Sequence, residues 1–142
     1  MSLSIFKMVS LFSGLSDDDL KEILELTTIK KYSKDNPIIF KEGDSGDSFY
    51  VITKGKVNVT RKNENGKVVV ISIMGPGDFF GEMSLIDGLP RSANIISITD
   101  TEVLVMNRED FLNLVNRNSK ISFNLTKNLC ERIRKLEFRI QE

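Results

Sequence analysis

Short β-forming runs separated by glycine-rich turns fill the middle of this 142-residue chain and constrain its fold more than any other feature. Between residues 28 and 106, stretches rich in Val, Ile, Phe and Thr alternate with turn residues. The expected strands span residues 37–40, 48–53, 56–60, 68–73, 92–98 and 102–106. Many short strands with glycine-rich turns are typical of a small jelly-roll or barrel. The pattern therefore predicts a β-roll.

The dipeptide Asn65-Gly66 lies between two of these runs and predicts a β-hairpin. The tightest hairpin turns need positive φ at both central positions, which Asn and Gly tolerate best. Val57 and Val59 alternate with polar residues, as expected for a strand with one exposed face.

Helical periodicity flanks the β region on both sides. Ser16 precedes three aspartates and a leucine-rich run, so Ser16 and Asp19 predict a capping box at a helix start. Residues 108–115 predict a short helix, and residues from 119 onward predict a longer one. An apolar stripe follows one face of the longer helix: Ile121, Leu125, Leu129, Ile133, Leu136 and Ile140. The stripe packs either on its own domain or against the same helix of a second copy.

The expected fold class is therefore α+β. A β-roll over about residues 28–106, built as a double-stranded jelly-roll barrel, is flanked by an N-terminal helix and by C-terminal helices over residues 108–142. Together these parts form one domain spanning residues 1–142, which is long enough to bury a substantial core. The sequence reaches Glu142 inside or just after a helix, which is compatible with a domain excised before an effector domain.

Composition excludes several classes of function. The chain has no histidine and one cysteine, so serine–histidine and cysteine–histidine catalysis, histidine-ligated metals and zinc clusters are excluded. We expect no catalytic residue, no metal site and no cofactor. Twenty basic and twenty acidic residues leave no basic excess for nucleic acid. No apolar run reaches the roughly 18 residues of a membrane span, and the single Cys130 fits a reducing cytoplasm.

The stretch from Gly81 to Ala93 carries the strongest functional signal. Gly81 lets the backbone approach another group closely, Glu82 supplies an acceptor, and Arg91 supplies a permanent planar cation. A helix starting near Glu82 would direct free N–H groups toward an anion. This set suits a ligand with hydroxyl groups and an anion, such as a sugar phosphate. The alternative is an Arg91–Glu82 ion pair that only holds a turn.

These motifs, in this order, resemble the cyclic nucleotide-binding domains of the bacterial catabolite activator protein, the regulatory subunits of protein kinase A and cyclic-nucleotide-gated channels. The resemblance covers nearly the whole chain, through residues 11–16, 42–44, 49–52, 54–55, 77–82 and 91–93. It implies that Glu82 accepts a hydrogen bond from the ribose 2′-hydroxyl and that Arg91 pairs with the phosphate oxygens. It adds to the same phosphate and ribose site Gly81, Met83, Ser84, Ser92 and Ala93.

The resemblance also bears on the base. Threonine at the position of Ser92 accompanies cyclic GMP preference in the family, whereas serine is found in cyclic AMP binders, so Ser92 favours cyclic AMP. The strand residues Val70, Ile71 and Ser72 resemble the wall that faces the base, and Arg134 is the polar candidate on the last helix. The alternatives are that the three strand residues have no ligand role and that the last helix forms an apolar lid.

We therefore expect a regulatory or sensor domain that is not an enzyme, binds cyclic AMP or cyclic GMP as its ligand, and relays occupancy through its C-terminal helix. One alternative is the ligand-binding part of a CRP-like transcription regulator without its helix-turn-helix. Another is a degenerate interaction domain that no longer binds ligand. As partners we expect the cyclic nucleotide and, where the apolar stripe is a dimer seam, a second copy; this chain alone is expected to bind neither nucleic acid nor membrane.

Overall fold

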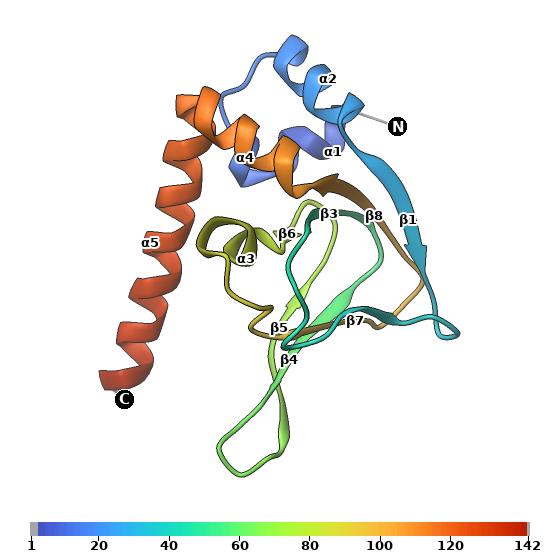
Figure 1. The fold of residues 1–142 in the computed structure, drawn as a ribbon, viewed down its shortest axis with the longest axis vertical. Helices are drawn as coiled ribbons and strands as arrows, with labels where there is room; N and C mark the ends of the chain where they lie inside the picture. The colour runs from blue at the N-terminus through green and yellow to red at the C-terminus, as the bar shows by residue number, and fades with distance from the viewer. Residues whose placement is uncertain (1–2, 142) are drawn as a thin grey trace.

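A computed structural model describes residues 3–141, with side chains described from residue 3 to residue 137. Two four-stranded antiparallel sheets form the expected β-roll (Figure 1). The first sheet has the order β1 (Thr28–Tyr32), β8 (Thr101–Asn107), β3 (Ser48–Lys54) and β6 (Phe79–Phe80). The second has the order β2 (Ile38–Phe40), β7 (Asn94–Ser97), β4 (Val57–Lys62) and β5 (Val68–Met74). With its flanking helices, the fold confirms the expected α+β class.

Most of the helices gather at one end of the roll. There lie α1 (Leu3–Met8), the 3₁₀ turn η1 (Ser10–Phe12), α2 (Asp17–Glu25) and α4 (Arg108–Arg117) (Figure 1). The short helix α3 (Glu82–Asp87) interrupts the roll between β6 and β7. The long helix α5 (Ser119–Gln141) leaves the helical end and runs along one side of the molecule.

Side-chain caps explain where two helices begin. The Ser16 hydroxyl accepts a hydrogen bond from the Asp19 N–H at 3.1 Å, which confirms the predicted start of α2. Asn107 caps α4 in the same way, through the Asp110 N–H at 2.8 Å. The sequence analysis missed α1, η1, β1 and β6. These elements are between two and six residues long, too short to carry a periodic signal.

The β4–β5 hairpin forms as predicted, but its turn differs from the expected type. Gly66 has φ 79°, while no described residue other than glycine has positive φ, so Asn65 does not adopt the left-handed conformation. The Gly66 N–H instead donates to the Asn63 carbonyl, and the Asn63 N–H donates to the Lys67 carbonyl. The Asn63 side chain also accepts from the N–H groups of Asn65 and Lys67. A wider turn with one left-handed glycine therefore joins the strands.

The hydrophobic core has two parts. One lies between the roll and the helices, where the Phe49 and Phe111 rings stack with centroids 4.7 Å apart. The other lies inside the roll and consists of buried residues from six strands: Tyr32, Tyr50, Ile52, Val57, Phe80, Ile95 and Val103. The first part fixes the helices on the roll, including α3 through Leu85, and the second fills the inside of the roll.

The buried apolar contacts of helix α5 lie in its first half among the residues whose side chains are described. Ile121 and Leu125 of the predicted stripe are buried, whereas Ile133 and Leu136 are each 55% exposed; the Ile140 side chain lies outside the described residues. The Asn124 amide donates to the carbonyls of Leu11 and Ser13 at 3.0 and 2.9 Å. Among the described side chains, those beyond residue 130 of α5 therefore make no comparably buried apolar contact.

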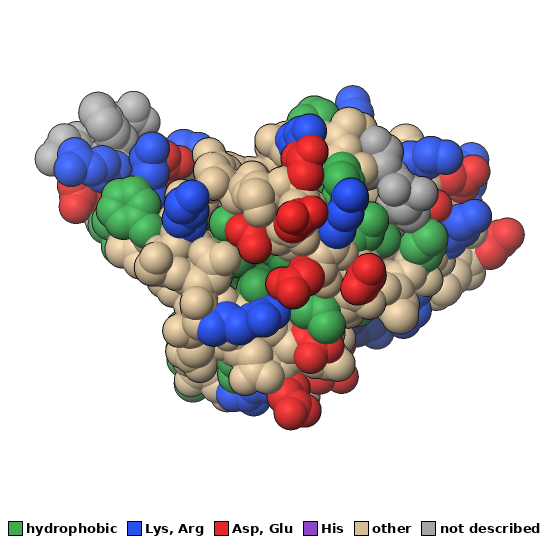
Figure 2. All heavy atoms as spheres, turned by 90° about the horizontal axis from the view of Figure 1, so that it is seen from above, with side chains coloured by type: hydrophobic (Ala, Val, Ile, Leu, Met, Phe, Trp, Pro, Cys, Tyr) green, Lys and Arg blue, Asp and Glu red, His purple; other side chains and the backbone are tan. Residues whose placement is uncertain are grey.

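The surface carries no large area of one charge on the side seen in Figure 2, where basic and acidic side chains are interspersed. Across residues 3–141, no helix is long and apolar enough to cross a membrane. Within the same residues, no group of three or more Cys, Asp or Glu side chains could hold a metal ion.

We predict that Asn124→Ala destabilises the protein by about 1–2 kcal/mol, because two carbonyls of the N-terminal segment lose their amide donor. Urea unfolding measures this change. The matched control is Asn128→Ala, since Asn128 makes one long hydrogen bond of 3.5 Å to Ser10, and it is expected to cost less than about 0.5 kcal/mol. Equal costs for the two variants would contradict the anchoring role of Asn124.

Candidate ligand-binding site

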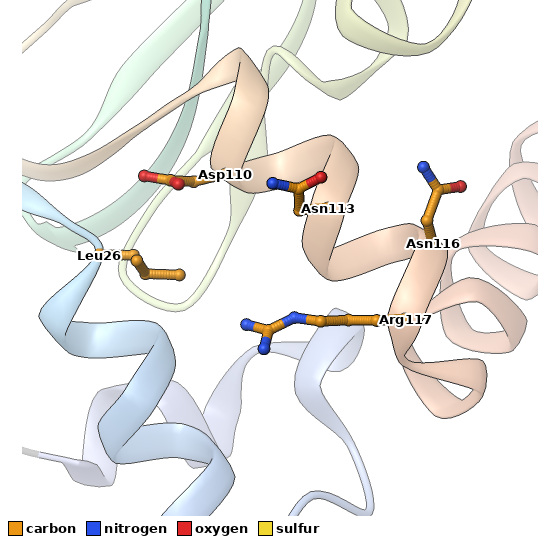
Figure 3. A pocket seen from close by; sticks show the side chains of 5 residues that line it. All are labelled: Leu26, Asp110, Asn113, Asn116 and Arg117. Carbon is orange, nitrogen blue, oxygen red and sulfur yellow. The ribbon is translucent and has the colours of Figure 1, made fainter.

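The described part of the chain contains a smaller cavity beside α4 and a larger one beside α3. The smaller, of about 480 Å³, lies between the end of α2 and α4 and is lined by Leu26, Asp110, Asn113, Asn116 and Arg117 (Figure 3). Its two asparagines and its arginine are exposed, and none of its polar atoms is buried without a partner. The larger, of about 800 Å³, is enclosed by β4, β5, α3 and α5 and has the size of a small-molecule site.

The larger cavity contains most of the residues singled out in the sequence. All seven residues expected at the phosphate and ribose line it: Gly81, Glu82, Met83, Ser84, Arg91, Ser92 and Ala93. Of the expected base-facing residues, Ile71 and Ser72 line it. Val70 and Arg134 are exposed and do not belong to its lining.

Gly81 lies between β6 and α3, as the N-cap of α3, in a conformation that other residues rarely adopt, with φ 92°. A Cβ atom on this residue would lie 2.9 Å from the Ser48 carbonyl oxygen and 3.0 Å from Nη1 of Arg91. A side chain here would therefore be strained and would also displace the guanidinium. Glycine at position 81 permits both the turn into α3 and the close approach of Arg91.

Arg91 is almost completely buried, with 4% of its surface exposed. Its Nη1 and Nη2 atoms donate to the carbonyls of Gly81 and Ser48, both at 2.7 Å. Its own main chain pairs with the Gly43–Asp44 turn, since the Arg91 N–H donates to Asp44 O and the Gly43 N–H donates to Arg91 O. This pairing gives a structural reason for the Glu-Gly-Asp turn noted in the sequence.

The Arg91 guanidinium keeps donors available. It carries five N–H donors, and two of them reach the carbonyls described above. Nε is buried without any partner. Burial lowers the pKa of Arg91 from its ordinary value, because desolvation disfavours the charged form, while Tyr50, Asp47 and Glu82 counteract part of this effect. An arginine nevertheless stays protonated in proteins, so the cavity wall carries a fixed positive charge with unused donors.

Glu82 is buried to the same degree, with 2% of its surface exposed. Its Oε1 atom lies 2.8 Å from Nη1 of Arg132 on α5, although this N–H does not align with the oxygen as a hydrogen bond requires. The observed ion pair is therefore Glu82–Arg132 and not the Arg91–Glu82 pair considered as the alternative. It connects the start of α3 directly to α5.

The sequence analysis missed Arg132 and selected Arg134 instead. Two residues along a helix turn its surface by about 200°, so these arginines lie on nearly opposite faces. Arg132 follows Leu129 by three positions and the buried Leu125 by seven, which places it on the inward face of α5. Counting helical spacings of three and seven residues from the buried part of the apolar stripe would have identified Arg132 as facing inward. Met8 and Ser10, which also line the cavity, precede the β-roll and gave no such signal.

Comparisons with known proteins agree with this geometry. A family model described as cyclic nucleotide-binding domain matches residues 30–118. The cyclic AMP receptor protein of Thermus thermophilus is 35% identical over 130 residues, 92% of this chain and 60% of the relative. The cGMP-dependent 3′,5′-cGMP phosphodiesterase A of Dictyostelium discoideum is 38% identical over 129 residues, 91% of this chain but 14% of the relative.

Structural similarity leads to the same group. The crystal structure of the Thermus thermophilus catabolite activator protein superimposes with a TM-score of 0.86 and 34% identity, covering 93% of this chain and 62% of that chain. The chain belongs to the cyclic nucleotide-binding domain family. It spans 60% or less of the length of the two relatives described above.

We predict that Gly46→Ala destabilises the protein by about 1–3 kcal/mol, because a Cβ at this position would lie 2.3 Å from Cβ of Ser84 on α3. Adding Ser84→Gly removes the second of these atoms. The double variant is therefore expected to be more stable than the two single changes summed, by about 1 kcal/mol in urea unfolding. Gly43→Ala serves as the control partner, since nothing lies within 4 Å of its Cβ position, and it is expected to be additive with Ser84→Gly. If the free-energy changes are additive for Gly46→Ala with Ser84→Gly as well as for Gly43→Ala with Ser84→Gly, then Gly46 is not needed for the packing of α3.

Proposed function

We propose that this domain binds a cyclic nucleotide in the larger cavity and acts as a non-enzymatic sensor. Arg91 donates to the cyclic phosphate through the N–H groups that the main-chain carbonyls leave free. Glu82 accepts from the ribose 2′-hydroxyl. The N–H groups at the start of α3 and around Ser92 complete the phosphate site. These roles follow the family resemblance and fit the chemistry of the cavity wall.

One observation carries the proposal. Glu82 and Arg91 are each at least 96% buried, line the same cavity, and each retain a polar atom without a hydrogen-bond partner. The Nε–H of Arg91 has no partner, and such an atom costs about 1–3 kcal/mol when it stays unpaired, whereas Oε1 of Glu82 has only its ion pair with Arg132. A phosphate beside a hydroxyl group would give Arg91 an acceptor and give Glu82 a donor in place of Arg132.

For the base, we propose a preference for cyclic AMP over cyclic GMP. The support is Ser92, an exposed residue at the cavity wall where the family's cyclic GMP binders carry threonine. Overall similarity does not decide between the two ligands, since the relative named for cyclic AMP and the relative named for cyclic GMP are 35% and 38% identical to this chain. The other base contacts are assigned to Ile71 and Ser72 on β5 and to Arg132 on α5, in place of Arg134.

The Glu82–Arg132 ion pair favours a second candidate, a domain that has lost its ligand. In that case Arg132 permanently provides the partner for the Glu82 carboxylate that a ribose hydroxyl would otherwise provide. The unpartnered Nε of Arg91 argues for the first candidate, because an internal replacement for the phosphate is missing there.

For the whole protein, we propose a regulator in the cytoplasm that carries an effector domain of its own. The kind of effector domain is not inferred from the receptor or the phosphodiesterase, because the sequence similarity to each covers only part of that relative. The exposed Ile133 and Leu136 on α5 are the proposed contact for a second copy of the chain. We do not expect residues 1–142 by themselves to bind DNA.

We predict that Arg91→Lys weakens cyclic AMP binding by about 10- to 150-fold in isothermal titration, since one or more charge-assisted hydrogen bonds are lost. Arg91→Ala is expected to abolish binding and to lower stability by at least about 2 kcal/mol, because two buried carbonyls lose their donors. Arg117→Lys, at the smaller cavity, is the matched control and should bind normally. Titration of the wild type with cyclic GMP tests the base preference. Unchanged affinity in Arg91→Lys would refute the assignment of the site.

We further predict that ligand binding changes the position of α5, because the ribose hydroxyl and Arg132 share the carboxylate of Glu82. A ligand shifts α5 only to the extent that it binds the two positions with different affinity. Hydrogen exchange of residues 128–137 is expected to differ between the free and the cyclic AMP-saturated protein. The difference should shrink in Arg132→Gln, while the exchange of the segment around the Asn124 anchor stays the same in both proteins. Equal protection of α5 with and without ligand would remove the relay.

A further inference from the structure

The guanidinium of Arg91 lies on an aromatic ring as well as between two carbonyls. Its Cζ atom is 4.1 Å from the centroid of the Phe40 ring, and 5.9 Å from that of Tyr50. Phe40 belongs to β2, 51 positions before Arg91 in the sequence, and the pairing of Phe40 with Ile95 on β7 brings the two together. Phe40 is half-buried and lines the larger cavity. Neither the sequence motifs nor the family resemblance singled it out.

The ring of Phe40 is itself held in place. It meets Phe80 edge-on at 5.7 Å and Tyr50 at 5.8 Å between centroids. Tyr50 and Phe80 are stacked on each other at 4.9 Å with an angle of 7° between their planes. A close-packed cluster of this kind leaves the Phe40 ring little freedom to turn away.

Different structural elements contact different atoms of the Arg91 guanidinium. The carbonyls of Gly81 and Ser48 hold its two terminal nitrogens, and its Cζ atom lies over the Phe40 ring. Arginine has a long stem with many rotamers, and fixing them before the ligand arrives makes binding stronger. The ring face is electron-rich and attracts a cation most strongly where water is excluded, as it is around this buried side chain.

We propose that Phe40 is a positioning residue for Arg91, which holds the guanidinium flat and in register for the phosphate through a cation–π contact. This inference rests on the proposed function, since it concerns the affinity of the same site. Phe40 acts through Arg91 and needs no contact with the ligand. A leucine fills much of the same space but lacks the negative ring face.

The test is a titration series with cyclic AMP. Phe40→Leu is expected to bind about 5- to 30-fold more weakly, the size of one desolvated cation–π contact, and Phe40→Tyr is expected to bind within about threefold of the wild type. Replacing Phe40 by mono-, di- and trifluorinated phenylalanine keeps the shape and weakens the negative face stepwise. Affinity should fall stepwise with it. Phe49→Leu, in the other core, controls for a general loss of packing and should leave the affinity of the folded protein unchanged.

The outcomes separate this inference from the proposed function. Suppose the wild type binds cyclic AMP. The positioning role alone is then overturned if the fluorinated variants bind as tightly as the wild type, or if Phe40→Leu binds no more weakly than Phe49→Leu. A wild type that binds no cyclic nucleotide overturns the proposed function. The positioning role is then decided by the nuclear magnetic resonance signal of the Arg91 Nε–H. The ring current of Phe40 should shift this signal in the wild type but not in Phe40→Leu, and an identical signal in both proteins would overturn it.

Discussion

The burial of one charged group, the guanidinium of Arg91, organises the functional half of this molecule. A charge removed from water is costly unless hydrogen bonds and polarisable neighbours replace its hydration. The replacements here come from three places in the sequence: the carbonyl of Ser48 at the start of β3, the carbonyl of Gly81 and the ring of Phe40. Each of these segments is fixed in position by the same cation. The roll therefore has a strong electrostatic reason to close around the site and not only a hydrophobic one.

The second buried charge connects that site to the rest of the protein. Glu82 stands at the first turn of α3 and reaches Arg132 near the middle of α5. The first half of α5 is held by Ile121, Leu125 and the Asn124 amide. Beyond Arg132 the exposed Ile133 and Leu136 add little contact with the roll. The ion pair thus lies just beyond the part of α5 that buried apolar side chains hold on the roll.

Local sequence patterns predicted the parts of the fold that depend on local physics. The cap at Ser16, the strands with regular alternation and the long helix were all predicted, because caps and periodicity act within a few residues. The elements α1, η1, β1 and β6 were missed, since their stability comes from burial of residues such as Phe6, Phe12 and Tyr32 against distant partners. The turn at Asn65 was assigned the wrong type, because the side chain of Asn63 supplies competing hydrogen bonds. At the site, the motif from Gly81 to Ala93 located the cavity wall, whereas Arg132 and Phe40 depend on which faces of α5 and β2 turn inward.

Both oxygens that hold Arg91 belong to the main chain, and this has a consequence for how such a site changes over time. No side-chain replacement at Ser48 can delete a peptide carbonyl, so that position is free to drift as long as its strand keeps its course. Gly81 has no such freedom. A side chain at this position would strain the backbone that carries the Gly81 carbonyl and would collide with Nη1 of Arg91. Inherited variation around Arg91 should therefore be uneven, because the carbonyl of position 48 tolerates side-chain changes and that of position 81 does not.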